Sequence, residues 1–240
     1  MALTVLFEGT VAKHVESPDD NEDARCLAPE RGRVVLSDGA SESFDARNWA
    51  RLLVERILEE ELSMDTVAVC ARSYEAIYDP DTLSWSKAAA YERGSFATLL
   101  IAQDLPDANT VQITAVGDSL AVWLDGDQWM ASAPYERSDQ FQEKPSLLAT
   151  RLELNESDDE HWSVREWKYE AQGDRFLLCM TDALGAWLLA HQERGDSSAL
   201  KLLSGIRYVQ ELTELVERER SAGRMRRDDS TLIIASVTQS

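Results

Sequence analysis

The order of strand and helix patterns in the sequence predicts a layered α+β domain, in which two β-sheets are covered by helices. Three observations indicate this fold class: β-rich runs occupy both ends and the middle of the chain, a helical pair follows the first strands, and further helical segments precede the last strand. No Gly/Ser linker or internal repeat divides the 240 residues, so we expect a single domain over residues 1–240.

The N-terminal part of the chain is predicted to form three strands and two helices. The strands are expected at residues 2–13, 24–28 and 33–37. The first of these has no basic leader, so it is interpreted as a strand and not as a signal peptide. Apolar residues at helical spacing predict an amphipathic helix over residues 45–62, capped by Ser43 or Asp45. A second helix over residues 65–78 is expected to end before Pro80.

The rest of the chain alternates between strands, an irregular segment and helices. Strands are expected at residues 95–102, 110–116, 120–124, 128–131, 162–169, 175–181 and 230–238. Helices are expected near residues 183–192, 197–204 and 207–221. Residues 132–161 are polar and irregular and end in the acidic stretch Glu156–Glu160, so we expect a mobile, flap-like insert there.

The charge of the chain excludes several kinds of partner. Acidic residues outnumber basic ones 44 to 24, which gives a formal net charge of -20. Nucleic acid requires a basic face, and so does an anionic membrane surface, so we expect neither as a partner. No apolar run approaches the roughly 20 residues of a membrane span. Hydrophobic residues make up 44% of the chain, which is typical of a globular protein.

The cysteines and histidines show no metal-binding pattern. Cys26, Cys70 and Cys179 are far apart and form no Cys-x-x-Cys pair, so neither a disulfide framework nor a thiolate zinc site is expected. A cytoplasmic location suits such a chain. The three histidines lack metal-ligand spacing, so surface or packing roles are expected for His14, His161 and His191.

Five acidic motifs occur in one order along the chain. They are Asn21-Glu22-Asp23, Asp38-Gly39, Gly117-Asp118-Ser119, Thr181-Asp182 and Asp228-Asp229-Ser230-Thr231. Four of them lie where a predicted strand begins or ends, and carboxylates gathered from strand ends can build an oxygen site for hard divalent cations. Each motif alone has an ordinary alternative, such as a tight turn, a solvated loop or, for Asp182, a helix N-cap. Their joint order is what indicates a metal site.

This set of motifs resembles that of the metal-dependent protein phosphatases of the 2C family, of the bacterial type. The family pattern runs through an acidic Asn-x-Asp or Glu-Asp element, Asp-Gly, Gly-Ser-Thr-Ala, Val-Gly-Asp-Ser, Ser-Asp-Gly and Asp-Asn-x-Thr. Besides Glu22-Asp23 and Asp38-Gly39, this chain offers Gly94-Ser95-Phe96-Ala97, Val116-Gly117-Asp118-Ser119, Thr181-Asp182-Ala183 and Asp228-Asp229-Ser230-Thr231. The resemblance covers nearly the whole chain and implies a four-layer α/β/β/α sandwich with two central antiparallel sheets.

The resemblance also implies roles for these residues. Asp38 would bridge two Mn²⁺ or Mg²⁺ ions and Gly39 would offer its carbonyl. Glu22 or Asp23 would serve one side of the metal pair, Asp182 and Asp228 the other, and Asp118 would help to hold a third, weaker ion. The implied catalytic residues are therefore Asp38, Asp182 and Asp228. The implied activity is hydrolysis of phosphoserine and phosphothreonine in phosphorylated proteins by a metal-activated water, in opposition to a serine/threonine kinase.

Several positions depart from the family pattern. Pro18 stands where the family usually has an arginine that grips phosphate, and Lys13 is the nearest earlier base. Ala40 and Ser41 follow Asp38-Gly39, so no imidazole is available there to protonate a leaving group. Leu120, Ala183 and Asp229 also replace family residues. Two alternatives stay open: a phosphatase-like binding or regulatory module with weak or no turnover, and a di-metal hydrolase of small phosphoesters.

A small basic patch adjoins the last acidic motif. Arg224, Arg226 and Arg227 lie directly before Asp228. The patch is interpreted as a solvated loop or as a surface that attracts a phosphopeptide.

Overall fold

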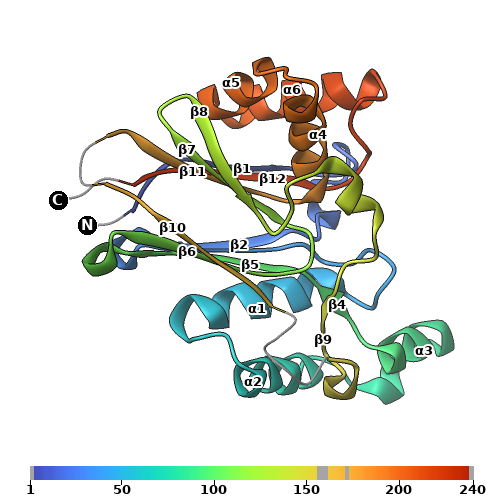
Figure 1. The fold of residues 1–240 in the computed structure, drawn as a ribbon. Helices are drawn as coiled ribbons and strands as arrows, with labels where there is room; N and C mark the ends of the chain where they lie inside the picture. Colours follow the sequence, from blue (N-terminus) through green and yellow to red (C-terminus); the bar gives the residue numbers. More distant parts are fainter. Residues whose placement is uncertain (1–2, 156–161, 171–172, 238–240) are drawn as a thin grey trace.

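Two five-stranded antiparallel sheets lie face to face in the computed structural model, and helices cover the outer face of each sheet (Figure 1). The structure describes residues 3–155, 162–170 and 173–237. The arrangement is a four-layer α/β/β/α sandwich of the α+β class, as the sequence predicts.

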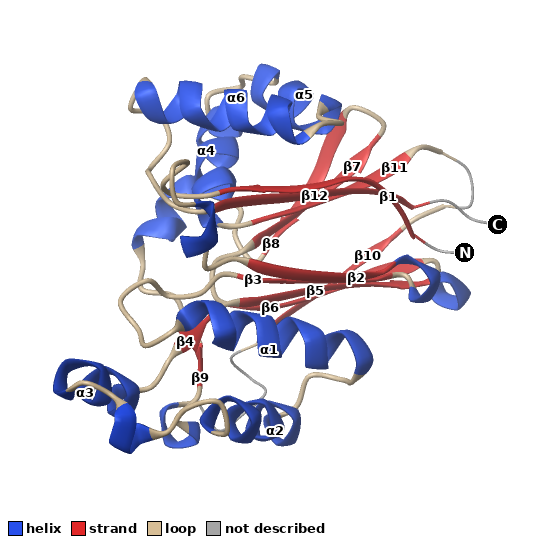
Figure 2. Cartoon of the chain, turned by 180° about the vertical axis from the view of Figure 1, so that it is seen from behind, coloured by secondary structure: helices blue, strands red, loops and turns tan. Residues whose placement is uncertain are grey.

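The first sheet has the strand order β1-β12-β11-β7-β8. Its strands are β1 (Leu3–Val11), β12 (Ser230–Val237), β11 (Arg175–Met180), β7 (Leu120–Asp125) and β8 (Gln128–Ala133). Its outer face is covered by α4 (Asp182–Glu193), α5 (Ser198–Gly205) and α6 (Val209–Ser221) (Figure 2). An apolar cluster fills this interface and includes Leu178 and Ile234 from the sheet and Leu184 from α4.

The second sheet has the strand order β10-β6-β5-β3-β2. Its strands are β10 (Ser163–Lys168), β6 (Thr110–Val116), β5 (Leu99–Leu105), β3 (Arg33–Ser37) and β2 (Ala24–Ala28). Its outer face is covered by α1 (Ala46–Glu59), behind which lies α2 (Met64–Glu75). The side chain of Trp49 on α1 is fully buried there, and its indole N–H donates a hydrogen bond of 2.8 Å to the carbonyl of Leu148.

The central strands are apolar on both faces because each lies between two layers. Successive side chains of a strand point to opposite faces of its sheet. In β3, Val34 and Leu36 belong to the core between the sheets, whereas Val35 belongs to the core beneath α1. In β11, Leu177 faces the other sheet and Leu178 faces the helices in the same way. Burial on both faces explains why these segments read as continuous apolar runs in the sequence.

The helix boundaries agree with most of the predicted ones, with one helix missed. The Asp45 side chain caps α1 by accepting a hydrogen bond of 3.3 Å from the amide of Asn48. The missed helix is α3 (Trp85–Arg93), which has no buried residue, and Trp85 is 85% exposed. A helix without a buried face shows no apolar stripe, so periodicity does not detect it. Within the described residues, no helix combines the length and apolarity of a membrane span.

The segment predicted as an insert is irregular but partly packed. Its strand β9 (Leu148–Ala149) pairs with β4 (Phe96–Ala97), and Phe141 packs into the core beneath α4. Short 3-10 turns lie at Ser138–Gln142 and Leu152–Leu154 within it, and elsewhere at Pro18–Asp20, Pro29–Arg31, Pro80–Thr82 and Pro106–Ala108. The acidic stretch Glu156–Glu160 lies outside the described residues. The mobility of this insert stays a prediction.

Candidate functional site

The acidic motifs meet at one edge of the sandwich because of its antiparallel topology. Asp38 follows β3, and Asp118 lies in the turn between β6 and β7. Asp182 follows β11, and Asp228 lies just before β12. In antiparallel pairs the end of one strand lies beside the beginning of its neighbour. Strand ends that are far apart in the sequence are therefore brought to the same edge.

A cavity of about 300 Å³ opens at this edge. Five of the predicted metal ligands line it, namely Asp38, Gly39, Asp118, Asp182 and Asp228. Two basic side chains, Lys13 and Arg226, line it as well. The cavity thus combines a dense set of carboxylates with two cations.

Backbone contacts fix the position of Asp38. Its amide donates a hydrogen bond of 3.0 Å to Thr98 Oγ1, and its carbonyl accepts one of 2.8 Å from the amide of Thr98. Thr98 Oγ1 also lies 3.0 Å from Ser119 Oγ, beside Asp118. Thr98 therefore ties two acidic motifs together. Sequence reasoning missed this residue, although it directly follows the Gly94–Ala97 motif.

Gly39 occupies a position that only a glycine fits. A Cβ atom there would lie 2.9 Å from backbone atoms of Ala46 at the start of α1. This close approach requires the absence of a side chain. The glycine therefore lets the helix lie directly against the loop that carries Asp38.

Asp23 lies apart from the cavity lining and is held by two hydroxyl groups. Its Oδ2 accepts hydrogen bonds from Thr231 Oγ1 at 2.6 Å and from Thr181 Oγ1 at 3.1 Å. Its Oδ1 is buried and has no hydrogen-bond partner among the described residues. Burial raises the pKa of Asp23 to about 7, although the two hydroxyls oppose the rise.

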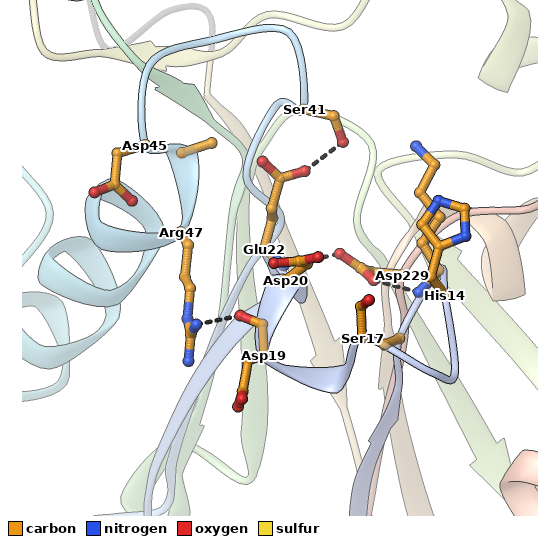
Figure 3. A pocket seen from close by; sticks show the side chains of 12 residues that line it. His14, Ser17, Asp19, Asp20, Glu22, Ser41, Asp45, Arg47 and Asp229 are labelled. Atoms are coloured by element: carbon orange, nitrogen blue, oxygen red, sulfur yellow. Dashed lines mark hydrogen bonds between the residues drawn. The ribbon is translucent and has the colours of Figure 1, made fainter. Parts of the chain in front are cut away.

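Glu22 lines a second cavity, of about 540 Å³, which adjoins the first (Figure 3). The two cavities share Lys13 and Ser41, and the Ser41 hydroxyl donates a hydrogen bond to the Glu22 carboxylate. Arg47 lies in the same cavity and donates a hydrogen bond to the carbonyl of Asp19. The two carboxylates of the first acidic motif thus have different surroundings.

Asp229, in the last acidic motif, connects two other segments of the chain through hydrogen bonds. It is 4% exposed, and its carboxylate accepts hydrogen bonds from the backbone amides of Lys13 at 2.6 Å and Glu22 at 2.8 Å (Figure 3). These bonds join the end of β1 to the first acidic motif. The neighbouring Asp228 side chain, by contrast, is 31% exposed and lines the cavity.

Asp182 is the first residue of α4, and the N-cap of that helix is Thr181. The alternative that Asp182 is the N-cap is therefore wrong by one residue. Asp182 is 5% exposed. Its Oδ2 forms an ion pair with the guanidinium group of Arg226, and its Oδ1 has no hydrogen-bond partner among the described residues.

The three arginines before Asp228 are exposed, in line with a solvated loop, but they make separate contacts. Arg224 donates hydrogen bonds to Glu219 at 2.7 and 2.9 Å. Arg227 donates to the carbonyl of Lys13 at 3.4 Å. Only Arg226 enters the acidic cavity, where its Nη2 also lies 3.6 Å from Asp228 Oδ2.

Burial and crowding make the negative charges of the cluster costly. Burial raises the pKa of Asp38 well above its usual range, and the charges of Asp23, Asp118 and Asp228 add to the rise. Burial also raises the pKa of Asp118. The positive charge of Arg226 opposes both shifts. Nearby positive charge therefore favours the ionised form of these carboxylates.

The acidic cavity offers oxygen donors of the kind preferred by the divalent cation that the resemblance implies. Carboxylate oxygens suit Mn²⁺ and Mg²⁺, and one buried oxygen each of Asp23 and Asp182, which has no hydrogen-bond partner among the described residues, is available as a ligand. In the part of the chain that the structure describes, however, no three Asp, Glu, His or Cys side chains converge in a metal-binding arrangement. The donor atoms are therefore of the kind that binds a divalent cation. In this arrangement, the positive charge beside them is that of Arg226.

Solved structures with the same fold include a serine/threonine phosphatase and a bacterial serine phosphatase. PstP/Ppp of Mycobacterium tuberculosis matches with a TM-score of 0.64 and 15% identity over 100% of both chains. A bacterial serine phosphatase matches with a TM-score of 0.61 and 16% identity over 100% of this chain and 99% of that one. PppA, a regulatory component of T6SS in Pseudomonas aeruginosa, matches with a TM-score of 0.58 and 18% identity over 99% of this chain and 98% of that one. No family model and no curated protein matches the sequence.

Proposed function

We propose that this chain, which has the fold of the bacterial 2C-type phosphatases, is a serine/threonine phosphoprotein phosphatase that depends on Mn²⁺ or Mg²⁺. The observation that carries the proposal is the meeting of Asp38, Asp118, Asp182 and Asp228 in one cavity. The similarity to solved phosphatases extends over the whole chain, so we propose that residues 1–240 act as one phosphatase domain.

Each acidic residue has a part in this proposal. Asp38, Asp182, Asp228 and the carbonyl of Gly39 would hold two ions, with Glu22 or Asp23 on the far side and Asp118 beside a third. Bound ions would supply an activated water for attack on phosphorus and neutralise charge on the phosphoryl oxygens. Thr98 holds the backbone of Asp38 in place through its two hydrogen bonds.

Lys13 is the best candidate for binding the phosphoryl group. It lines both cavities, and its side chain is 37% exposed. Its Nζ lies 3.4 Å from Asp228 Oδ1, so the ammonium group of Lys13 is already at the acidic cavity. We propose that Lys13 takes over the phosphate contact that Pro18 cannot make.

The proposed substrate is a phosphorylated protein, opposite a serine/threonine kinase in a signalling pathway. The net charge of -20 disfavours nucleic acid and anionic membranes as partners. Cys26, Cys70 and Cys179 are free thiols, which suits the reducing cytoplasm that we propose as its location.

Two observations favour a second candidate function. Arg226 lies among the carboxylates, and the phosphate-gripping arginine of the family is missing. A phosphatase-like module that binds a partner with little turnover would share both features. Activity measurements separate the two candidates.

The test compares phosphate release from a phosphothreonine peptide by the wild type, Asp38→Asn and Asp182→Asn, all with Mn²⁺. Both variants should lose at least about a hundredfold in kcat/KM while keeping a cooperative melt, because each removes a ligand charge. Asp107→Asn, at an exposed position in the turn before β6, is the matched control and should keep wild-type activity. Near-normal turnover in both site variants would show that the site is placed wrongly.

A further inference from the structure

The guanidinium group of Arg226 lies beside the buried carboxylate of Asp182 in the acidic cavity. It pairs with Asp182 Oδ2 and lies 3.6 Å from Asp228 Oδ2. Its charge also acts on Asp38 and Asp118, where it opposes the rise in pKa. A single side chain thus balances carboxylates from four different strand ends.

We propose that Arg226 is a built-in counter-ion that competes with the divalent cation for the acidic cavity, so that metal binding displaces its guanidinium group. The inference rests on the proposed metal dependence. A divalent ion needs its carboxylate oxygens at roughly 2.0 to 2.6 Å and repels a second cation held on the same group. Arginine cannot relieve this conflict by losing its proton, because its pKa is too high.

The contacts of Arg226 suit a displaceable group. Its two ion pairs with described residues are both to cavity carboxylates, and 45% of its side chain is exposed. Arg220, also before β12, differs in both respects. Its side chain is 1% exposed, and it donates a hydrogen bond of 2.9 Å to the carbonyl of Ala12. Arg220 is therefore a fixed structural cation, whereas Arg226 can turn outward without breaking a hydrogen bond to any described backbone group.

Asp182 supplies an independent reason to place a ligand here. Only 5% of this residue is exposed, and its Oδ1 has no hydrogen-bond partner among the described residues. A buried carboxylate oxygen without a partner is costly, and a bound cation would satisfy it. Arg226 satisfies only the other oxygen of the same carboxylate. The arginine is thus an incomplete substitute for an ion at this position.

The experiment titrates Mn²⁺ into the metal-free full chain by calorimetry and compares the wild type with Arg226→Met and Arg227→Met. Arg227 is the matched control, because it is the next residue, carries the same charge and contacts only the backbone carbonyl of Lys13 among its described contacts. Arg226→Met should bind Mn²⁺ at least about tenfold more tightly than the wild type. Arg227→Met should stay within about twofold, because a more distant, exposed charge is screened.

Thermal melting gives a second readout that does not depend on activity. Mn²⁺ should raise the melting temperature of Arg226→Met more than that of Arg227→Met, because tighter binding to the folded state stabilises it more. If Arg226→Met does not fold, Arg226→Lys replaces it. Lysine keeps the charge, but its ammonium group ends a shorter side chain than the Nη2 atom through which Arg226 contacts both carboxylates, so Mn²⁺ should bind this variant more tightly than the wild type.

Two kinds of result would overturn the inference, and they are distinguishable. Equal Mn²⁺ affinities in Arg226→Met and Arg227→Met, or an affinity of Arg226→Lys no higher than that of the wild type, would refute competition by Arg226 and leave the metal dependence standing. The absence of Mn²⁺ binding and of Mn²⁺-dependent turnover in every variant would refute the proposed function, and the inference with it.

Discussion

Thr231 donates a hydrogen bond of 2.6 Å to Oδ2 of Asp23 across 208 residues of the sequence. The bond joins the last acidic motif to the first and fixes the orientation of the Asp23 carboxylate. The second oxygen, Oδ1, is thereby left buried and without a hydrogen-bond partner in the part of the chain that is described. A fixed carboxylate with one free oxygen is the arrangement that a preorganised metal ligand needs.

Thr231→Val should loosen this carboxylate. The variant loses a hydroxyl donor, so we expect Mn²⁺ to bind about three to tenfold more weakly, with a loss of about 1 kcal/mol in the free energy of unfolding. Thr213→Val on α6 is the control, because the Thr213 hydroxyl donates only to the carbonyl of Val209 in its own helix among its described contacts. Calorimetric titration of both variants checks the prediction. Equal Mn²⁺ affinities in the two variants would show that Thr231 does not position a ligand.

Asp228 and Asp229 are adjacent and chemically identical, yet they should respond differently to mutation. Asp229→Ala leaves the amides of Lys13 and Glu22 without acceptors, so we expect a loss of at least about 2 kcal/mol in the free energy of unfolding. Asp228→Ala removes one of several crowded negative charges and should cost less than about 1 kcal/mol without metal. Urea denaturation of both metal-free variants measures the difference, and the reverse order would contradict the roles assigned to them.

Glu219 gives a pH-dependent prediction outside the site. Its carboxylate accepts hydrogen bonds from Arg224 at 2.7 Å, Arg218 at 3.1 Å and Trp187 at 3.2 Å. These contacts, above all the one with Arg224, lower the pKa of Glu219 from 4.5 to about 2. Because the folded pKa lies below the unfolded one, this stabilisation is fully present above about pH 4.5 and is lost as the pH falls toward 2.

Glu219→Gln should therefore lower the free energy of unfolding at pH 7 by about 2 kcal/mol, since the charged acceptor is lost. The difference between the wild type and the variant should shrink between pH 4.5 and pH 2, where the wild-type carboxylate also becomes neutral. Denaturant melts at several pH values measure this difference. A difference that stays constant over that range would mean that the Glu219 charge does not contribute.

The layers and the acidic strand ends could be predicted because both leave local signals. Val34, Val35 and Leu36 form a continuous apolar run because their strand is buried on both faces, and Asp38 follows where that strand ends. The same reasoning located Asp182 at the end of β11.

The role of Arg226 could not be predicted, because its neighbours come from elsewhere in the chain. It stands in a polar run, and its ion-pair partner Asp182 lies 44 positions earlier in the sequence. The different surroundings of Asp228 and Asp229 also leave no signal in the local sequence, because only the fold brings the amides of Lys13 and Glu22 to Asp229.

The most direct test of the account measures phosphate release from a phosphothreonine peptide by protein freed of metal with a chelator. The account predicts no release without metal, release after addition of Mn²⁺ or Mg²⁺, and no release by Asp38→Asn in either condition. Release that is undiminished by excess chelator would contradict a metal-activated water. A wild type and an Arg226→Met variant that both bind Mn²⁺ without releasing phosphate would contradict the phosphatase activity and favour the binding module.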